Sequence, residues 1–395
     1  METTFFKHLS VGTLSALLLT GLTPTAGAAE APIKFGFPIP ITGEIPKVGE
    51  STKLAAEMLQ EEVNAKGGLL VGGKIYPLEF IYEDNESKPD TAVNVTLKLI
   101  DRDKVLVVIG PQSSRQAVPA AGVADDNETP LITPWSTNPE ATKDRPWVFR
   151  AAFLDPFQAP VITDFAMKQF QAQKAAVLYE ISNDYSKGLA DNFKEAWEKK
   201  NGPDSVIAFE SHGPKDADFS SQLTTIIKAD PDFLFLPQNY SFAAMIIRQA
   251  RDLGFKKPFM GSDAWGSAEL MKLCGDDCKG QYFSTHYAAA GATGATKEFI
   301  DKYNKKYGYV PDDVAALTWD AINIALQAIQ DGGRVEPNLA AERKLIRDNI
   351  ANIKNFKGIT GDMRFDDQGD PIKCAVVVKI DDQGEFTFVE SVCPK

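Results

Sequence analysis

Two stretches of the chain decide its fold: Val105-Leu-Val-Val-Ile-Gly-Pro-Gln-Ser-Ser114 and, after it, Leu131-Ile-Thr-Pro-Trp-Ser-Thr-Asn-Pro139. Each begins as a short apolar run and ends in a turn rich in hydroxyl, glycine and proline residues. A longer stretch with helical periodicity separates them. Short apolar runs bounded by turn signals predict buried strands, and strands that alternate with helices predict a parallel sheet.

The same alternation continues on both sides of these stretches. We expect strands at 33–38, 78–83, 105–109, 131–133, 175–179, 206–210, 233–236, 259–261 and 280–285. We expect helices at 51–65, 90–101, 185–199, 219–229, 242–253, 296–307, 312–331 and 339–352. Because the pattern occurs before and after about Arg150, the sequence predicts an α/β protein of two doubly wound parallel-sheet lobes, with several crossings that form a hinge.

The first residues predict an exported protein. An apolar run at 9–22 is followed by the small residues Ala26-Gly-Ala28, the layout of a secretory signal peptide. A membrane-spanning helix is the alternative, but this run is short for the roughly 30 Å of hydrocarbon in a bilayer. We expect residues 1–29 to be removed just before Ala29 or Glu30, which leaves a periplasmic protein without a lipid anchor.

Composition and motifs exclude several classes of function. The 395-residue chain has a formal net charge of −12, which argues against nucleic acid and anionic membranes as partners. The sequence contains no nucleophile elbow, zinc-binding His pair, phosphate loop or dinucleotide fingerprint. We therefore expect no enzyme, no cofactor and no metal. Nothing in the sequence signals an oligomer, so a monomer is the expectation.

Four cysteines suggest disulfide bonds, because the chain is expected outside the cytoplasm. Cys374 and Cys393 flank two strand-like runs around a turn at Gln383-Gly384, which brings them nearly opposite each other in a hairpin. Cys274 and Cys278 can close a small loop. A metal site is the alternative, but the spacing is not that of a zinc site.

The strand-to-helix junctions hold the candidate ligand-binding residues, because ligands of open α/β sheets bind at the carboxyl ends of strands. Ser113-Ser114 and Ser136-Thr137 each stand at an expected helix start, where free N–H groups and the helix dipole favour an anion. Ordinary N-capping is the alternative. Two such junctions at neighbouring strands can hold one carboxylate.

The second half of the chain offers a matching set. Asp263 follows a strand and precedes Trp265, and an acid in an apolar, aromatic cleft needs a cationic partner such as a ligand ammonium. A solvent-facing turn is the alternative for Asp263. Tyr185 and Tyr240 also follow strands and offer an apolar face with a hydroxyl, although both can equally be core residues.

Several short motifs, taken in order, carry a family resemblance. They are Asn64-Ala-Lys-Gly-Gly68, Val108-Ile-Gly110 before Ser113-Ser114, Ser136-Thr-Asn-Pro-Glu140, Arg248-Gln-Ala-Arg251, Phe259-Met-Gly261 and Asp367-Gln-Gly-Asp370. Through most of the mature chain, the sequence resembles the leucine/isoleucine/valine-binding proteins. These are the type I periplasmic solute-binding proteins of branched-chain amino-acid ABC importers.

The resemblance implies residue roles and lobe boundaries. Ser114 and Thr137 would bind the α-carboxylate of an amino acid, whereas the carbonyl of Ser136 and the carboxylate of Asp263 would receive its α-ammonium. Tyr185 and Tyr240 would close from the second lobe. The lobes would comprise 30–150 plus 286–357 and 151–285 plus 358–395, and the partner would be the membrane permease of an ABC importer.

Three departures from the family alter the expected pocket. Asp263 stands where the family often has Glu, Val48 stands where the leucine-type protein has Trp, and Trp135 replaces a small residue. With Trp265 and the two tyrosines, this rim is aromatic and carries no second charge. We therefore expect a neutral amino acid with an apolar side chain. The alternatives are an aromatic or aliphatic carboxylic acid, a sensor module for a membrane receptor, and a secreted enzyme.

Overall fold

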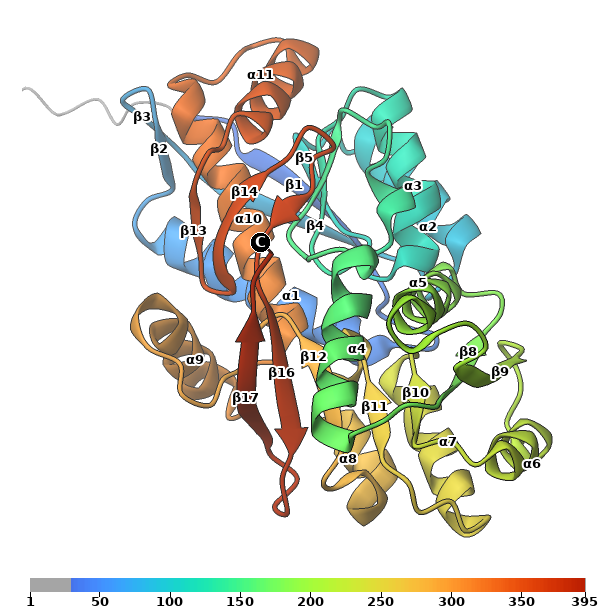
Figure 1. Cartoon of the computed structure of the whole chain (residues 1–395). Coiled ribbons are helices and arrows are strands. Elements are labelled where there is room, and N and C mark those ends of the chain that lie inside the picture. Colours follow the sequence, from blue (N-terminus) through green and yellow to red (C-terminus); the bar gives the residue numbers. More distant parts are fainter. Residues whose placement is uncertain (1–29, 395) are drawn as a thin grey trace, which may run out of the picture.

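Residues 30–394 are described by the computed structural model in Figure 1, so the expected signal peptide lies outside the described residues. The first half of the chain builds a five-stranded sheet in the order β4-β1-β5-β6-β7, in which all neighbours are parallel. Its strands are β1 (Ile33–Ile39), β4 (Leu78–Asp84), β5 (Val107–Ile109), β6 (Leu131–Thr133) and β7 (Val148–Arg150).

The second half builds a seven-stranded sheet in the order β17-β16-β12-β11-β10-β8-β9. Five strands are parallel, and the C-terminal hairpin adds two antiparallel strands at one edge. The strands are β8 (Ala175–Glu180), β9 (Val206–His212), β10 (Phe233–Leu236), β11 (Phe259–Gly261), β12 (Tyr282–Thr285), β16 (Ala375–Ile380) and β17 (Phe386–Val392).

Helices cover both faces of each sheet, as Figure 1 shows. In the first lobe, α2 (Pro89–Asp101) and α3 (Ser114–Asp126) pack together, while α1 (Pro46–Ala65), α9 (Gly294–Tyr307), α10 (Asp313–Gly332) and α11 (Leu339–Ala351) form the other layer. The second lobe has α4 (Asp155–Phe170) with α5 (Asp184–Asn201), and α6 (Ser220–Ala229), α7 (Tyr240–Asp252) and α8 (Glu269–Cys274). The predicted fold class, two doubly wound parallel-sheet lobes, is confirmed.

Some elements were not expected from the sequence. Helix α4 was not assigned, nor were the short strands β2 (Leu69–Val71) and β3 (Lys74–Tyr76). A small third sheet joins β13 (Phe356–Gly358), β14 (Gly361–Phe365) and β15 (Pro371–Ile372). Strands this short give little periodic signal, because two or three residues cannot establish an alternation.

Both expected disulfides form, which excludes the metal-site alternative for these cysteines. Cys274 bonds Cys278 around a short turn, and Cys374 bonds Cys393 across the C-terminal hairpin. The hairpin register pairs Ala375 with Val392, which places the two cysteines opposite each other as the turn at Gln383-Gly384 predicts.

Three segments cross between the lobes, and their side chains contact one another. The amine of Lys373 donates to the carbonyl of Ala151 at 3.1 Å, and the rings of Phe153 and His286 lie 3.9 Å apart. Residues 359–370 bond to the first lobe, for example through Asp320, although the sequence assigns them to the second. The third crossing therefore lies after Asp370, and the remaining lobe boundaries stay a prediction.

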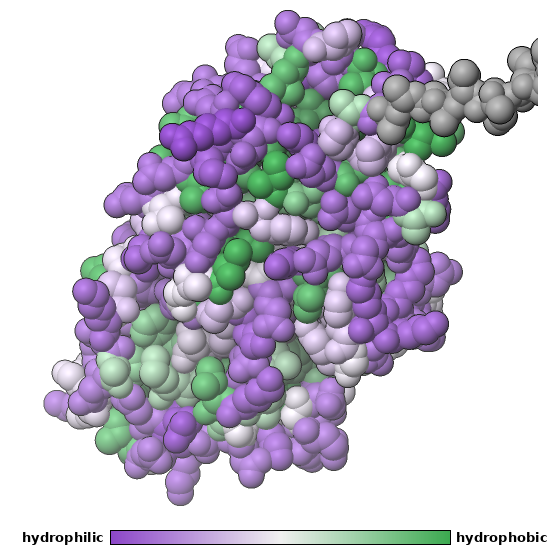
Figure 2. Space-filling model, turned by 180° about the vertical axis from the view of Figure 1, so that it is seen from behind, coloured by the Kyte–Doolittle hydropathy of each residue, from purple (hydrophilic) through white to green (hydrophobic). Residues whose placement is uncertain are grey.

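The surface matches the acidic, polar composition. Figure 2 shows hydrophilic side chains over most of the rear face, with hydrophobic residues scattered among them. Among residues 30–394, every helix is too short or too polar to cross a bilayer.

Candidate functional site

The two lobes meet around a small cavity at the carboxyl ends of their strands. It is lined by Ser113, Ser114, Trp135, Tyr185, Asn239, Asp263 and Ala264, which come from both lobes. Its volume is about 10 Å³, room for about one water molecule. The lobes are therefore closed on each other. Of the residues expected to bind the ligand, the structure brings Ser114, Tyr185 and Asp263 to this cavity, with Trp135 of the expected rim.

The first-lobe side of the cavity is the beginning of α3. Ser113 precedes the helix and makes no side-chain capping bond, so its hydroxyl is not used for ordinary N-capping. The hydroxyls of Ser114 and Ser136 lie 2.9 Å apart, and the N–H of Asn138 donates to Ser114 Oγ at 3.4 Å. Free N–H groups, the helix dipole and two hydroxyls meet here, which suits a carboxylate.

The expected helix start at Ser136-Thr137 is wrong. These residues precede only a 3-10 turn, Pro139–Ala141, which Asn138 caps by accepting from the N–H of Glu140. Asn138 is extended because it precedes a proline, and this ends any helix before Pro139. Ser136 and Thr137 are buried beside Ser114 but begin no α-helix. Helix α3 therefore supplies the helix N-terminus on the first-lobe side of the cavity, while α5 and α7 begin at the second-lobe side.

The side chain of Arg150 fixes the turn at residues 136–138 by hydrogen bonds. Its guanidinium is fully buried and donates to the carbonyls of Ser136 and Asn138 at 2.8 and 2.9 Å. It also donates to Thr142 Oγ1 at 2.6 Å and to Asp370 Oδ1 at 2.5 Å. Ammonium binding by the Ser136 carbonyl stays a prediction. The structure does not favour it, since that carbonyl already faces a cation.

The second-lobe side is centred on Asp263, which is 1% exposed and does not face solvent. Its Oδ1 accepts from Tyr185 Oη at 2.7 Å and from Gln158 Nε2 at 2.6 Å. Its Oδ2 lies 3.6 Å from His286 Nε2. Burial lowers the pKa of His286, so the imidazole is neutral at neutral pH and leaves the charge of Asp263 unbalanced.

Two further buried acids surround Asp263. Burial, with the nearby carboxylate of Asp263, raises the pKa of Asp155 to about 8. Burial also raises the pKa of Asp313 well above its usual range, and Asp312 and Asp263 add to this effect. Asp155 therefore holds a proton at neutral pH. The cleft resists more negative charge and favours a cationic group.

Asp155 gives the stability of the protein a distinct pH dependence. Its pKa is raised on folding to about 8 from an ordinary value near 3.8, so the native state binds the extra proton between these pH values. This contribution is present at low pH and is lost as pH rises through about 8. We expect Asp155→Asn to flatten the fall in melting temperature between about pH 6 and pH 8. Parallel thermal melts of both proteins measure this, and equal slopes would show that Asp155 is already ionised at pH 6.

The other expected residues lie away from the cavity. Tyr240 begins α7 and is buried, but its neighbour Asn239 lines the cavity instead. Val48 is buried within α1. Trp265 is fully buried, donates to the carbonyl of Leu236 at 3.2 Å and packs on Gly261, so it supports the site from the core. The binding roles of Tyr240, Val48 and Trp265 stay predictions that the geometry does not favour.

Three contacts join the lobes beside the cavity. Asn239 Nδ2 donates to Glu44 Oε1 at 2.6 Å, and Asn138 Nδ2 donates to the carbonyl of Asp184 at 2.8 Å. The third is an ion pair between Arg115 and Glu180, with the closest atoms 3.5 Å apart. These bonds join residues on opposite lobes, so they favour closure.

We expect Glu44→Ala to lower ligand affinity by about three- to tenfold, because it removes a closed-state bond of about 1 kcal/mol without touching the cavity. Calorimetric titration measures the change. Lys187→Ala is the control, because that lysine is exposed and pairs with Asp191 of its own helix. Equal affinities for the Glu44 variant and the unmodified protein would mean that this bond does not stabilise the liganded state.

Two α/β lobes, three crossings and a polar cleft between the lobes define a two-domain binding protein. The chain belongs to the periplasmic binding protein family, which matches residues 32–385. The expectation that it is not an enzyme is thereby confirmed, and it is a solute-binding protein of the ABC transporter class.

Relatives and solved structures agree with this assignment. The leucine-, isoleucine-, valine-, threonine-, and alanine-binding protein of Pseudomonas aeruginosa is 28% identical over 90% of this chain and 91% of its own length. The leucine-binding protein LivK of Thermotoga maritima is 31% identical, covers 92% of this chain and 99% of its own, and has a TM-score of 0.83. LivJ of Streptococcus pneumoniae, solved with isoleucine, is 30% identical over 92% of this chain and all of its own, also with a TM-score of 0.83. The resemblance to the leucine/isoleucine/valine-binding proteins is confirmed.

A solute-binding protein of R. palustris solved with benzoate shares the fold, with a TM-score of 0.80 and 22% identity over 92% of this chain and 97% of its own.

Proposed function

We propose that the chain is the periplasmic substrate-binding component of an ABC importer, and that it captures an α-amino acid between its lobes. The observation that carries this proposal is the pairing, across one cavity, of the α3 N-terminus with the buried carboxylate of Asp263. The first suits a carboxylate and the second requires a cation, and an amino acid carries both at a fixed short separation. The names of the relatives in Pseudomonas and Thermotoga support the same ligand class.

A carboxylic acid without an amine fits this cleft less well. Its single charge would meet the α3 N-terminus, but Asp263 would keep no cationic partner beyond a neutral histidine. Asp155 and Asp313 would make that cost larger, because any proton they lose adds a negative charge. The likeness to the benzoate-binding protein therefore supports the fold and not the ligand.

Capture would work by hinge closure. A ligand stabilises the closed state only by contacts that the open state lacks. An amino acid held by Ser114 on one lobe and by Asp263 with Tyr185 on the other makes both sets of contacts only when the lobes meet. The closed protein would then deliver the ligand to a membrane permease. Export by the expected signal peptide is part of this proposal.

A thermal-shift panel of amino acids and simple carboxylates tests the proposal. We expect melting temperature to rise with at least one α-amino acid and to stay unchanged with benzoate and with aliphatic acids. Native mass spectrometry of the purified protein, which identifies any molecule that copurifies, is an independent test. Stabilisation by carboxylates alone would contradict the proposal.

The predicted neutral, apolar side chain depends on a rim without a second charge. Of the expected rim residues, Val48, Tyr240 and Trp265 do not line the cavity, whereas Tyr185 does, and so does Trp135. Its indole N–H donates to Asp313 at 3.2 Å, which adds an acid to that rim.

A further inference from the structure

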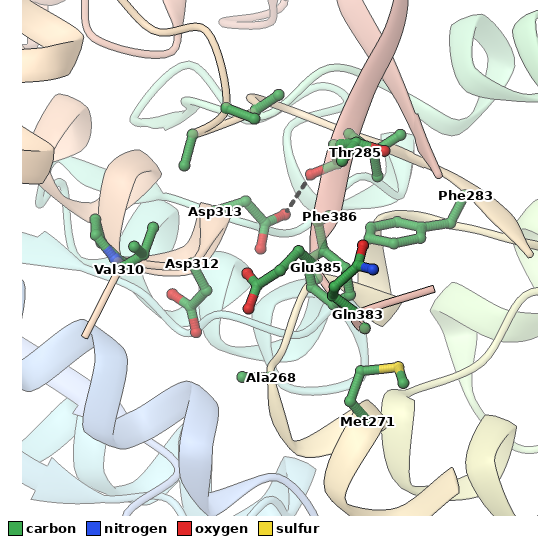
Figure 3. Close-up of a pocket in the computed structure, with 18 of the residues that line it drawn as sticks. Ala268, Met271, Phe283, Thr285, Val310, Asp312, Asp313, Gln383, Glu385 and Phe386 are labelled. Carbon is green, nitrogen blue, oxygen red and sulfur yellow. Dashed lines mark hydrogen bonds between the residues drawn. The ribbon is translucent and has the colours of Figure 1, made fainter. Parts of the chain in front are cut away.

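A much larger groove lies beside the closed cavity, and Figure 3 shows its lining. Its volume is about 730 Å³, within the range of small-molecule sites. The turn before α8, strand β12, the loop that precedes α10 and the tip of the C-terminal hairpin all contribute to it. Both lobes therefore form its walls.

Trp135 and a short turn separate the groove from the cavity. Trp135 lines the cavity, whereas Asp313, the acceptor of its indole N–H, lines the groove. Ala264 lines the cavity and Gly266, two residues later, lines the groove. The two spaces are therefore neighbours on either side of Trp135 and this turn.

Asp313, which lines the groove, has one carboxylate oxygen without a hydrogen-bond partner among the residues that the structure describes. Asp313 is 3% exposed, and its Oδ2 is near Trp135 Nε1 and Thr285 Oγ1, at 3.2 and 3.4 Å. Its Oδ1 is buried and has no hydrogen-bond partner among residues 30–394. A buried acid without a partner is costly, so this oxygen calls for a donor from the ligand.

Gly266 leaves room beside that oxygen. A Cβ at this position would stand 2.6 Å from Asp313 Oδ1, closer than any side chain tolerates. Its φ of −64° is one that any residue adopts. The glycine is therefore needed for its lack of a side chain and not for its backbone conformation.

The charges along the groove leave this end negative. Lys272 and Lys279 line the groove, but each is paired at 2.6 Å with an acid of its own segment, Glu269 and Asp276 respectively. Within the described part of the chain Asp312 and Asp313 form no ion pair, and Lys373, the buried amine whose charge Asp313 favours, does not line the groove. The groove therefore complements a positive group at the α10 end.

We propose that the ligand's side chain passes Trp135 into this groove and ends in an ammonium or guanidinium group that pairs with Asp313 Oδ1. The ligand is then a basic α-amino acid. This inference rests on the proposed function, because Ser114 and Asp263 hold the α-carboxylate and α-ammonium. It replaces the neutral side chain that the rim residues alone predict.

Calorimetry on the mature protein with matched pairs of ligands tests the inference that the ligand is basic. Lysine and norleucine differ by the terminal amine, and arginine and citrulline differ mainly by the charge. We expect the cationic member of at least one pair to bind about tenfold or more tightly. In Asp313→Asn this preference should disappear, while the affinity for the neutral member changes by less than about threefold.

Two further variants separate pairing from folding. Gly266→Ala keeps Asp313 but crowds its Oδ1. This variant should therefore weaken the binding of the cationic ligand of each pair more than the binding of the neutral one. Asp382→Asn removes an exposed acid of the same hairpin tip that does not line the groove, and it should leave the preference intact because water screens that charge.

Each outcome has a definite meaning. Equal or tighter binding of norleucine and citrulline overturns this inference but leaves the amino-acid proposal standing. Equal losses for both members in Asp313→Asn assign the residue a structural role and also overturn it. If no α-amino acid binds at all, the proposed function fails as well.

Discussion

Asp263→Asn is expected to lower the affinity for the best-bound α-amino acid by about 30-fold or more. The amide keeps an acceptor for Tyr185 and Gln158 but loses the charge that the ligand ammonium needs. Removing one partner of a buried charge pair costs about 2–5 kcal/mol, which sets this magnitude. Calorimetric titration of the purified variant measures the loss.

A matched control separates the effect of losing a buried charge from the general effect of losing one negative charge. Asp184 is exposed and adjoins Tyr185, so Asp184→Asn removes a nearby charge that water already screens. We expect its affinity to stay within about twofold of the unmodified protein. Similar losses in the two variants would indicate a long-range charge effect, and an unchanged affinity in Asp263→Asn would remove this residue from the site.

Arg150→Met is expected to lower the free energy of unfolding by about 3–5 kcal/mol, because it leaves a buried acid without its cation. Asp370 and the carbonyls of Ser136 and Asn138 would all lose their donor at once. Urea unfolding measures the change. Ligand affinity should fall too, since this guanidinium positions the turn beside Ser114.

Two further variants test whether the effect of Arg150→Met comes from the buried charge. Lys143→Met, an exposed residue of the same segment that pairs with Glu140, should change stability by less than about 0.5 kcal/mol. The double variant Arg150→Met/Asp370→Leu should recover part of the loss, because no unpaired acid remains. A loss below about 1 kcal/mol in Arg150→Met would show that the guanidinium does not hold the turn.

Alternating apolar runs were sufficient to predict both sheets apart from β7, an edge strand of the first sheet. Buried parallel strands leave short, clear apolar segments, and ligand sites occur where such strands end. That rule brought Ser114, Tyr185 and Asp263 together although they lie far apart in the chain. It did not bring Tyr240 and Trp265 to the cavity lining, because a position after a strand does not fix the direction of a side chain.

The remaining site residues gave no local signal. Gln158 comes from the unassigned helix α4, His286 from a crossing segment, and Asp313 from the first turn of α10. Each meets Asp263 or Trp135 through tertiary packing over a long sequence separation. At Ser136-Thr137, the following Asn138-Pro139 pair could have warned against a helix start, since a residue before proline is extended.

We propose that the cleft binds both charges of a zwitterionic amino acid, one on each lobe. The most direct test is a calorimetric comparison of the tightest-binding amino acid with its analogue lacking the α-amine and its analogue lacking the α-carboxylate. We expect each analogue to bind at least about 30-fold more weakly than the parent amino acid. Binding of the amine-free acid as tightly as the amino acid would contradict this proposal.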